Sequence, residues 1–566
     1  MRILFITSAH NSLSQRLQVE LADRGHAVPV HVAASDEGMV AAVHTQQPDL
    51  IVAPMLKRAI PRAIWQRHIC LIVHPGIKGD RGPSSLDWAI ALGEPSWGVT
   101  ILQAVAEMDA GPIWAVEEFP LPQRPATKSG VYRGAVTEAA VAALLAAVAR
   151  YERGGFEPEA LDYRRPDVRG SLRPAMKQAD RAIDWSSDPT ARIVRRIRAA
   201  DSSPGVLDAT LVGEEIFLYG AHEEDRLRGA PGQFLAQREG AVCVGTVDGA
   251  LWVSHLKAKC LSPYAGIKLP AAQVLGPRLE GVPERPIAPT DANDYRTLRD
   301  IVYSERHGVG YLAFDFYNGA MSTRQCCRLR EAFRRARAAD TKVIVLLGGR
   351  HYFSNGIHLN AIEAAPDPAA ESWANINAID DLVLDVLETR SHLLVSALGG
   401  NAGAGGAMLA LAADRVYARE GVVLNPHYKG MGGLYGSEYW TYTLPRRVGQ
   451  RTALELTDRL SAISARYARE LNFVDEAFGR GAREFETGVV RRAEDLADRH
   501  DFTAMLAAKW ERRQADERRK PLAAYRAEEL ARMSGNFFGP DSAYHEARQR
   551  FVLKGASRTI IDCPVS

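Results

Sequence analysis

Short runs of apolar residues alternate with amphipathic helical patterns over the first 163 residues of the chain. The apolar runs include RILFIT, VPVHVAA, DLIVAPM and ICLIVHPG, and the helical pattern LSQRLQVELADRG separates the first two. Such short apolar runs are typical of strands in a parallel sheet whose two faces are covered by helices. We therefore predict an α/β unit with a parallel sheet at the N-terminus.

The pattern changes twice further along the chain. After a stretch with the composition of a linker, PEALDYRRPDVRGSLRP, one helical pattern precedes the alternating runs EIFLYGA, AVCVGTV and ALWVSHLKA, which predict a small β-rich domain. A Pro-rich joint then leads to GYLAFDFYNG, KVIVLLGG and HLLVSALGG, which predict a second α/β unit that ends in charge-rich helices. We expect five segments: 1–165, 166–270, a linker at 271–294, 295–525 and a tail at 526–566.

Composition and charge narrow the class of protein. The 566 residues carry 70 basic and 68 acidic side chains, and this near balance provides no field that would attract nucleic acid or a membrane surface. The first apolar run is too short for a signal peptide, and we expect no later run to span a bilayer. The six cysteines show no metal-binding spacing, and His351 and His358 have no third ligand nearby. We predict a cytoplasmic protein with reduced thiols and no metal site.

The first candidate site lies where an apolar run ends at His74, directly before Pro75 and Gly76. Ligands of open α/β sheets bind at the carboxyl ends of strands, and a second apolar run leads to Asp109 in a DAG turn. A histidine oriented by an aspartate can act as a general acid and base. The alternative is a loop histidine and an aspartate that caps a turn.

The stretch around His74 resembles the family of 10-formyltetrahydrofolate-dependent formyltransferases, whose motif runs N-x-H-P-S…R-G…P…W-A-I…G-V-T…D-x-G. The positions that match are His74, Pro75, Arg81, Gly82, Pro83, Trp88, Ala89, Ile90, Gly98, Val99, Thr100, Asp109 and Gly111. The resemblance implies that His74 and Asp109 assist attack on the formyl carbon of the folate. The segment that follows, with IDWS and IRAADSSPG, is similar to the C-terminal domain of methionyl-tRNA formyltransferase.

One position departs from the formyltransferase motif. The family's asparagine, which donates to the developing oxyanion, is Ile72 here, and losing such a donor typically lowers the rate ~100–1000-fold. Either another donor replaces it, or the acceptor is a better nucleophile such as a thiol, or the site only binds its ligand. Ile72 and Arg81 are expected beside the folate, and Gln15 at the strand-end crevice is expected to contact a ligand, unless it only begins a helix that Ser12 or Ser14 caps.

Two glycine-containing turns form the second candidate site. HYFSNGIHLN and NAGAGGAMLALAADRVYA resemble the enoyl-CoA hydratase (crotonase) superfamily, in which two backbone N–H groups hold a thioester oxygen. The resemblance assigns these donors to Ile357 and Gly405. Ser354, Asn355, Gly356 and Gly406 belong to the same turns and are expected to help bind coenzyme A. Tight turns that serve only packing are the alternative.

The two carboxylates of the hydratases are absent from this chain. Counted from Gly405, their positions are held by Met408 and Tyr428, and Glu438 follows within VLNPHYKGMGGLYGSEYWTYTL. We interpret this Gly- and aromatic-rich stretch as a rebuilt wall of the site, in which Glu438 tunes or relays protons through Tyr428. Aromatic side chains that seal an unused pocket are the alternative.

The combination of the two halves resembles the HypX (HoxX) family of hydrogenase maturation factors over nearly the whole chain. The resemblance implies formyl transfer from 10-formyltetrahydrofolate to coenzyme A, and then decarbonylation of formyl-CoA to CO and CoA by a lyase-type step. It also implies hydrogenase maturation proteins as partners. A hydrolase that releases formate, and a non-catalytic scaffold that binds folate and CoA, are the two rival hypotheses.

Overall fold

The structure, a computed structural model, describes residues 1–122, 126–259, 266–540 and 542–554. The chain divides into two compact units, Met1–Leu256 and Lys257–Ser566. Of the six cysteines, Cys260 and Cys563 lie outside the described residues. The four described cysteines are free thiols, and they are Cys70, Cys243, Cys326 and Cys327.

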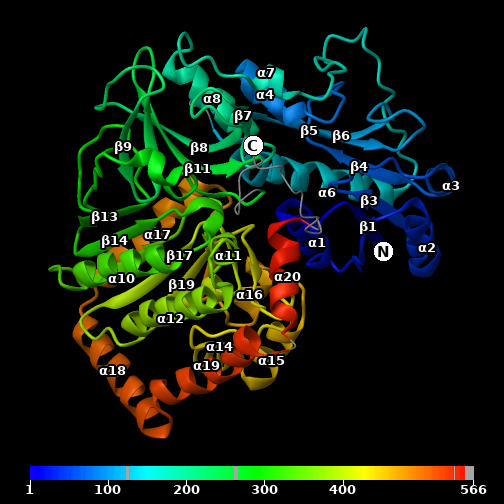
Figure 1. Ribbon diagram of the computed structural model, residues 1–566. Coiled ribbons are helices and arrows are strands. Elements are labelled where there is room, and N and C mark those ends of the chain that lie inside the picture. The colour runs from blue at the N-terminus through cyan, green and yellow to red at the C-terminus, as the bar shows by residue number, and fades with distance from the viewer. Residues whose placement is uncertain (123–125, 260–265, 541, 555–566) are drawn as a thin grey trace. The chain divides into compact units, whose positions relative to one another are not determined.

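The first unit begins with a six-stranded sheet of order β2-β1-β3-β4-β5-β6 (Figure 1). Its strands are β1 (Ile3–Thr7), β2 (Val30–Val32), β3 (Leu50–Ala53), β4 (Cys70–His74), β5 (Ser96–Gln103) and β6 (Ile113–Pro120). The first four strands are parallel, as the short apolar runs predict. The last two are antiparallel, with His74 opposite Thr100. Asp109 therefore lies in the β5–β6 loop and not at the end of a parallel strand.

Helices cover both faces of this sheet. They are α1 (Ser12–Ala22), α2 (Asp36–Gln46), α3 (Arg62–Trp65), α4 (Ser85–Leu92), α5 (Lys128–Val131), the π-helical turn η1 (Tyr132–Val136) and α6 (Thr137–Arg153). The run Lys128–Arg153 is long and apolar enough, with a mean hydropathy of 1.5, to cross a membrane by length and composition, which we did not expect of any segment. Its apolar side chains pack into the core on β5 and β6, and this packing accounts for its composition.

The Pro-, Arg- and Asp-rich stretch after α6 does not behave as a free linker. Lys78, in the loop after β4, forms ion pairs with Glu159 at 2.6 Å and Asp167 at 2.5 Å. Backbone hydrogen bonds join the same loop to 170–173, where the Gly170 amide donates to the Lys78 carbonyl and the Arg81 amide donates to the Ser171 carbonyl. The stretch is therefore part of the structure that holds the loop after His74.

A β-rich segment follows, as the alternating runs predict. Its elements are α7 (Gln178–Arg181), α8 (Thr190–Ala200), β7 (Val206–Asp208), β8 (Ile216–Glu224), β9 (Phe234–Arg238), β10 (Ala241–Gly245) and β11 (Ala250–Ala258). The strands form a sheet of order β7-β8-β11-β10-β9. The second unit starts with β12 (Leu269–Pro270), α9 (Ala271–Leu275) and the 3₁₀ turn η2 (Gly276–Leu279), so part of the expected linker is helical.

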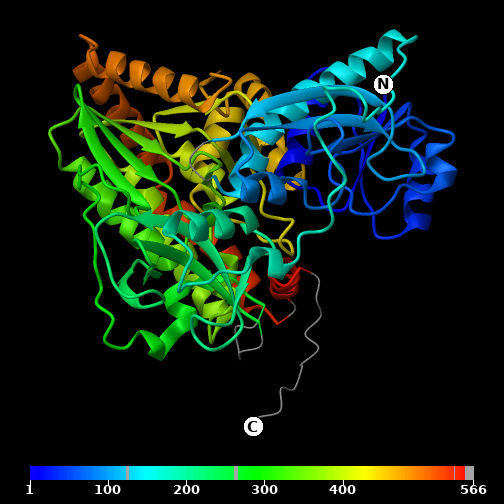
Figure 2. The same cartoon turned by 90° about the horizontal axis from the view of Figure 1, so that it is seen from above.

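The second unit is built on a sheet of order β13-β14-β15-β17-β19-β22. Its strands are β13 (Ile301–Arg306), β14 (Val309–Phe314), β15 (Val343–Leu347), β17 (Leu393–Leu398), β19 (Arg415–Arg419) and β22 (Glu476–Phe478). One face packs on α10 (Thr323–Arg337) and α12 (Pro368–Leu387) in the larger core. The other face packs on α17 (Ala482–Ala497), drawn in orange in Figure 2, and on the start of α18 (Phe502–Arg519).

A second, smaller sheet carries the glycine-containing turns. Its strands are β16 (Tyr352–Ser354), β18 (Asn401–Gly403), β20 (Val423–Asn425) and β21 (Ile463–Ser464), in that order. The remaining elements are η3 (Tyr317–Gly319), α11 (Leu359–Glu363), α13 (Gly405–Leu411), α14 (Trp440–Val448), α15 (Gln450–Asp458), α16 (Ala465–Glu470), α19 (Leu522–Phe538) and α20 (Ala543–Val552). The expected tail at 526–566 begins inside α19, and its residues 541 and 555–566 lie outside the described residues.

The start of α13 lies very close to the turn after β16. A Cβ atom on Gly406 would overlap the backbone carbonyl of Ser354, so this position requires glycine for close approach. A Cβ atom on Gly356 would lie 3.1 Å from the Gly405 amide nitrogen. The two glycine-containing turns, far apart in the sequence, are therefore adjacent in the fold.

We predict that Gly406→Ala lowers the stability of the protein by about 1–3 kcal/mol or more, because the backbone at Ser354 must move. Thermal unfolding by calorimetry would measure this loss. The matched control is Gly535→Ala in α19, where no atom lies within 4 Å of the added Cβ and a gain of up to ~1 kcal/mol is expected from helix propensity. Equal stability of the two variants would contradict the close approach.

Candidate functional site

The first site places His74 between two carboxylates. His74 ends β4 and is 5% exposed. Its Nε2 lies 3.0 Å from Asp80 Oδ2, and its Nδ1 lies 3.7 Å from Asp109 Oδ1. The structure therefore brings together the histidine and aspartate that the sequence indicates, and it adds a second carboxylate on the opposite ring nitrogen.

Asp80 is the residue that sequence reasoning missed. Its side chain is fully buried, and its Oδ1 has no hydrogen-bond partner among the residues that the structure describes. The signal in the sequence is Gly76, since a Cβ there would lie 2.5 Å from both Asp80 Oδ2 and His74 Nε2. The glycine two residues after the histidine thus leaves room for a second partner of the imidazole.

Arg81 holds the loop that carries Asp109. Its Nε and Nη2 donate to the Met108 carbonyl at 3.2 and 3.1 Å, and Nη2 also forms a 2.6 Å ion pair with Glu107. Asp109 has a left-handed backbone with φ of 56°, and its Oδ2 accepts a 3.4 Å hydrogen bond from the Gly82 amide. The Arg81-Gly82 pair therefore positions Asp109, and the expected contact of Arg81 with folate stays a prediction.

Ile72 makes apolar packing contacts, and Gln15 hydrogen-bonds to a nearby backbone carbonyl. Ile72 is partly buried and packs on the cluster beneath α2 and α3, so it supplies an apolar surface and no side-chain donor. The Gln15 side chain donates to the His10 carbonyl at 3.4 Å. The cap of α1 is Asn11, whose Oδ1 accepts from the Ser14 amide, and neither Ser12 nor Ser14 serves as the cap.

The second site is formed by the two adjacent glycine-containing turns. Gly405 is the first residue of α13, and Ala404 before it has a φ of 47°. Within the ranges that the structure describes, neither the Ile357 amide nor the Gly405 amide donates to a protein acceptor. A pair of unused N–H groups, one of them at a helix N-terminus, can hold a carbonyl oxygen that gains negative charge.

The other residues of these turns mostly satisfy one another. Ser354 Oγ accepts from the Gly356 amide at 3.0 Å and is fully buried. Asn355 donates through Nδ2 to the Asn318 carbonyl at 2.8 Å. His358 caps α11 through Nδ1, and burial lowers its pKa to about 4, so its imidazole is neutral. These side chains fix the shape of the turn that presents the Ile357 amide.

Glu438 and Tyr428 lie together at the second site. The Tyr428 hydroxyl donates to Glu438 Oε2 at 2.8 Å, and both side chains are buried. The other carboxyl oxygen, Oε1, lies against Gly405, because it would overlap a Cβ atom built there. The structure therefore places the carboxyl group of Glu438 against the Cα of Gly405, the first residue of α13.

The surroundings of Glu438 favour its uncharged form. Burial, and next the charge of Asp380, raise the pKa of Glu438 to about 8. Burial, and next the charge of Glu438, raise the pKa of Tyr428 well above its ordinary value. At neutral pH this pair holds two protons that it can donate. Met408, at the position of the first hydratase carboxylate, is fully buried in the apolar core.

Three protein-family models match parts of this chain. The model of the formyl transferase family matches residues 29–148, and that of the formyl transferase C-terminal domain matches residues 175–266. The enoyl-CoA hydratase/isomerase model matches residues 307–557. The chain is thus a formyltransferase module joined to a crotonase-fold module, which confirms the predicted fold class.

Similarity to individual proteins shows which family the chain belongs to. The chain is 48% identical to the hydrogenase maturation factor HoxX of Bradyrhizobium diazoefficiens, over 98% of this chain and 95% of that protein. It is similar to the crystal structure of HypX from Aquifex aeolicus in complex with tetrahydrofolic acid, with a TM-score of 0.94, 45% identity, and 99% and 97% of the two chains covered. It is also 32% identical to methionyl-tRNA formyltransferase of Roseiflexus castenholzii over 36% of this chain and 65% of that protein. The chain belongs to the HoxX (HypX) family of hydrogenase maturation factors.

The raised pKa of Glu438 predicts a pH-dependent cost of folding. A carboxyl group whose pKa is raised from 4.5 to about 8 favours the fold below pH 4.5, and this contribution is lost as the pH rises through 8. Glu438→Gln has no such loss. We expect its Tm to match the wild type at pH 5 and to exceed it by about 2–4 °C at pH 9.

Differential scanning calorimetry from pH 5 to pH 9 checks this expectation. Glu470→Gln is the control, because its side chain is 57% exposed and should leave the Tm unchanged at both pH values. A Glu438→Gln variant that follows the wild type at every pH would show that Glu438 is charged in the folded protein at neutral pH.

Proposed function

We propose that this chain makes CO for the maturation of a hydrogenase in two steps. The formyl group of 10-formyltetrahydrofolate passes to the thiol of coenzyme A, and formyl-CoA is then split into CO and CoA. Hydrogenase maturation proteins are the expected partners of the chain. Membership of the HoxX family and the tetrahydrofolic acid complex of the Aquifex relative support the substrates. The carboxyl group of Glu438 against Gly405, the first residue of α13, is the observation that carries the second step.

In the first step the CoA sulfur attacks the formyl carbon, and N10 of the folate leaves. The thiol gives up one proton and N10 takes one, so a single group can serve both. His74, held by Asp80 and Asp109, is the residue for this transfer. A thiolate is a stronger nucleophile than an amine, which offsets the missing donor at Ile72. Gln15 and Ile72 would contact the folate, and Arg81 would keep Asp109 in place.

In the second step the amides of Ile357 and Gly405 hold the formyl oxygen. Gly356 and Gly406 allow the two turns to approach each other, and Ser354 and Asn355 stiffen the first turn. Coenzyme A would bind along these turns, with its sulfur next to the Glu438 carboxyl group. The turns thus position the thioester for the proton transfers.

One carboxyl group can carry both proton transfers. Glu438 gives its proton to the sulfur as the C–S bond breaks, and the electron pair of that bond leaves with sulfur to form the CoA thiol. The resulting carboxylate then takes the formyl hydrogen as a proton, and the C–H electron pair stays on carbon to form CO. The Tyr428 hydroxyl stabilises the carboxylate between the two transfers through its 2.8 Å hydrogen bond.

We predict that substitutions at the two sites separate the two steps. With 10-formyltetrahydrofolate and CoA, both His74→Ala and Glu438→Gln should lower CO formation by about 100-fold or more. With formyl-CoA supplied directly, His74→Ala should retain CO formation while Glu438→Gln and Tyr428→Phe should lose it. The absorption spectrum of reduced haemoglobin measures the CO.

The control is Tyr467→Phe, which makes the same change at a tyrosine that is 40% exposed, and it should retain wild-type activity. Formate without CO would make the second site a hydrolase. Tight binding of folate and CoA without either product would favour a scaffold. Wild-type rates of CO release by Tyr428→Phe would remove Tyr428 from the mechanism.

A further inference from the structure

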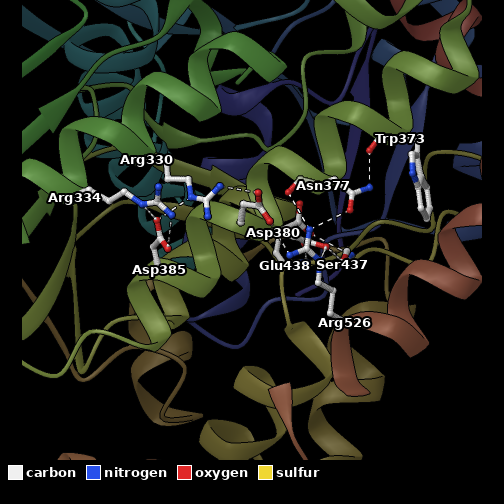
Figure 3. Close-up of polar contacts among 10 residues, drawn as sticks. Arg330, Arg334, Trp373, Asn377, Asp380, Asp385, Ser437, Glu438 and Arg526 are labelled. Atoms are coloured by element: carbon white, nitrogen blue, oxygen red, sulfur yellow. Dashed lines mark hydrogen bonds and ion pairs between the residues drawn. The ribbon is translucent and has the colours of Figure 1, made fainter. Parts of the chain in front are cut away.

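Three buried carboxyl groups meet at the short turn 437–441. Glu438 belongs to the turn, Asp380 comes from α12 and Glu529 comes from α19. Their residues are 1%, 0% and 1% exposed. Figure 3 shows Asp380 beside Ser437 and Glu438, with Arg526 reaching toward them from α19. The proposed mechanism uses Glu438 but gives no role to the other two carboxyl groups.

Asp380 and Glu529 bind the backbone of this turn. Asp380 accepts from the Glu438 amide at 2.8 Å and from Ser437 Oγ at 2.8 Å. Glu529 accepts from the amides of Tyr439 at 3.0 Å and Thr441 at 2.9 Å. The two carboxyl groups therefore hold two successive backbone amides in place, that of Glu438 and that of Tyr439.

The backbone that they fix is an unusual one. Glu438 and Tyr439 have φ angles of 60° and 57°, and a left-handed backbone costs each such residue about 1–2 kcal/mol. Two non-glycine residues in succession keep this conformation only where surrounding contacts impose it. The hydrogen bonds to Asp380 and Glu529 supply these contacts, and the conformation directs the Glu438 carboxyl group toward Gly405.

The two carboxyl oxygens of Glu438 differ in how well each can carry the acid proton. Oε2 accepts from the Tyr428 hydroxyl at 2.8 Å and from the Ser437 amide at 3.1 Å. An oxygen that accepts two hydrogen bonds is the poorer place for the acid proton. The proton therefore belongs on Oε1, which is the oxygen beside Gly405.

Most of the ionisable side chains around Glu438 are acidic. The ionisable groups that face it from the elements packed around it are Tyr428, Asp380, Glu529 and Cys326. Arg526 Nε lies 3.9 Å from Asp380 Oδ2, while its Nη1 pairs with Asp381 at 2.7 Å. Burial, as the largest cause, raises the pKa of Asp380 to about 6 and that of Glu529 to about 7, so both lose protons before Glu438 does.

We propose that Asp380 and Glu529 are positioning residues for Glu438, which hold its turn against Gly405 and keep its carboxyl group in the acid form. This inference rests on the proposed function and deepens it, since it assigns the groups that prepare Glu438 to give a proton to the CoA sulfur. A purely structural carboxyl pair would hold the turn without affecting the titration of Glu438.

The test compares Asp380→Asn and Glu529→Gln with Asp381→Asn in the full chain. Asp381 is the next residue on α12 and pairs with Arg526 and Arg330, outside the turn. CO release from formyl-CoA is measured from pH 6 to pH 10. In the wild type it should fall as the pH rises through about 8. Removing a like charge lowers the pKa of Glu438, so in both test variants the fall should move down by about 1 pH unit, and Asp381→Asn should not move it.

Infrared titration of the Glu438 carboxyl band, identified by its loss in Glu438→Gln, provides a readout without activity. The band should persist to about pH 8 in the wild type and to lower pH in Asp380→Asn. A wild-type band that disappears near pH 4.5 would overturn the proposal. So would variants that lower the rate equally at all pH values without moving the band. If the wild type releases no CO while the band behaves as expected, the proposed function fails and the positioning of Glu438 stands.

Discussion

The carboxyl group of Glu438 can lie beside the start of α13 only because Gly405 has no side chain. Several other residues of the second unit make this close contact possible. Gly436 leaves room for the ring of Tyr428, and Gly406 lets α13 approach the turn after β16. The helices α12 and α19 then supply the acceptors that hold the turn from the other side. Backbone proximity, more than any one side chain, allows a buried carboxyl group to lie against the first residue of α13.

The two sites use acidic neighbours in different ways. In the first unit His74 has a carboxylate at each ring nitrogen, so its imidazole is fixed in orientation and can pass a proton. In the second unit carboxyl groups surround another carboxyl group, and burial, together with the charge of Asp380, favours the protonated form of Glu438. In the proposed mechanism, carboxyl neighbours thus orient a base at the first site and surround an acid at the second.

The fold class could be predicted from local patterns, and so could the candidate residues that the structure brings together, such as His74 with Asp109. The apolar runs indicate the strands, and the spacing of His74, Asp109 and the glycines identifies two family motifs. Asp380 and Glu529 could not be found in this way, because they come from helices distant in sequence and their role depends on tertiary packing. The antiparallel direction of β5 and β6 was missed because apolar runs carry no information on strand direction.

The stretch 159–173 has a consequence for how this chain could arise by gene fusion. A formyltransferase module that ended directly after α6 would lack the acidic partners of Lys78 and the backbone contacts that support the loop after His74. Recombination at that point would keep every strand of the first sheet but leave the loop after His74 without these contacts. The functional border of the first module therefore lies beyond Arg173, past the stretch whose composition resembles a spacer.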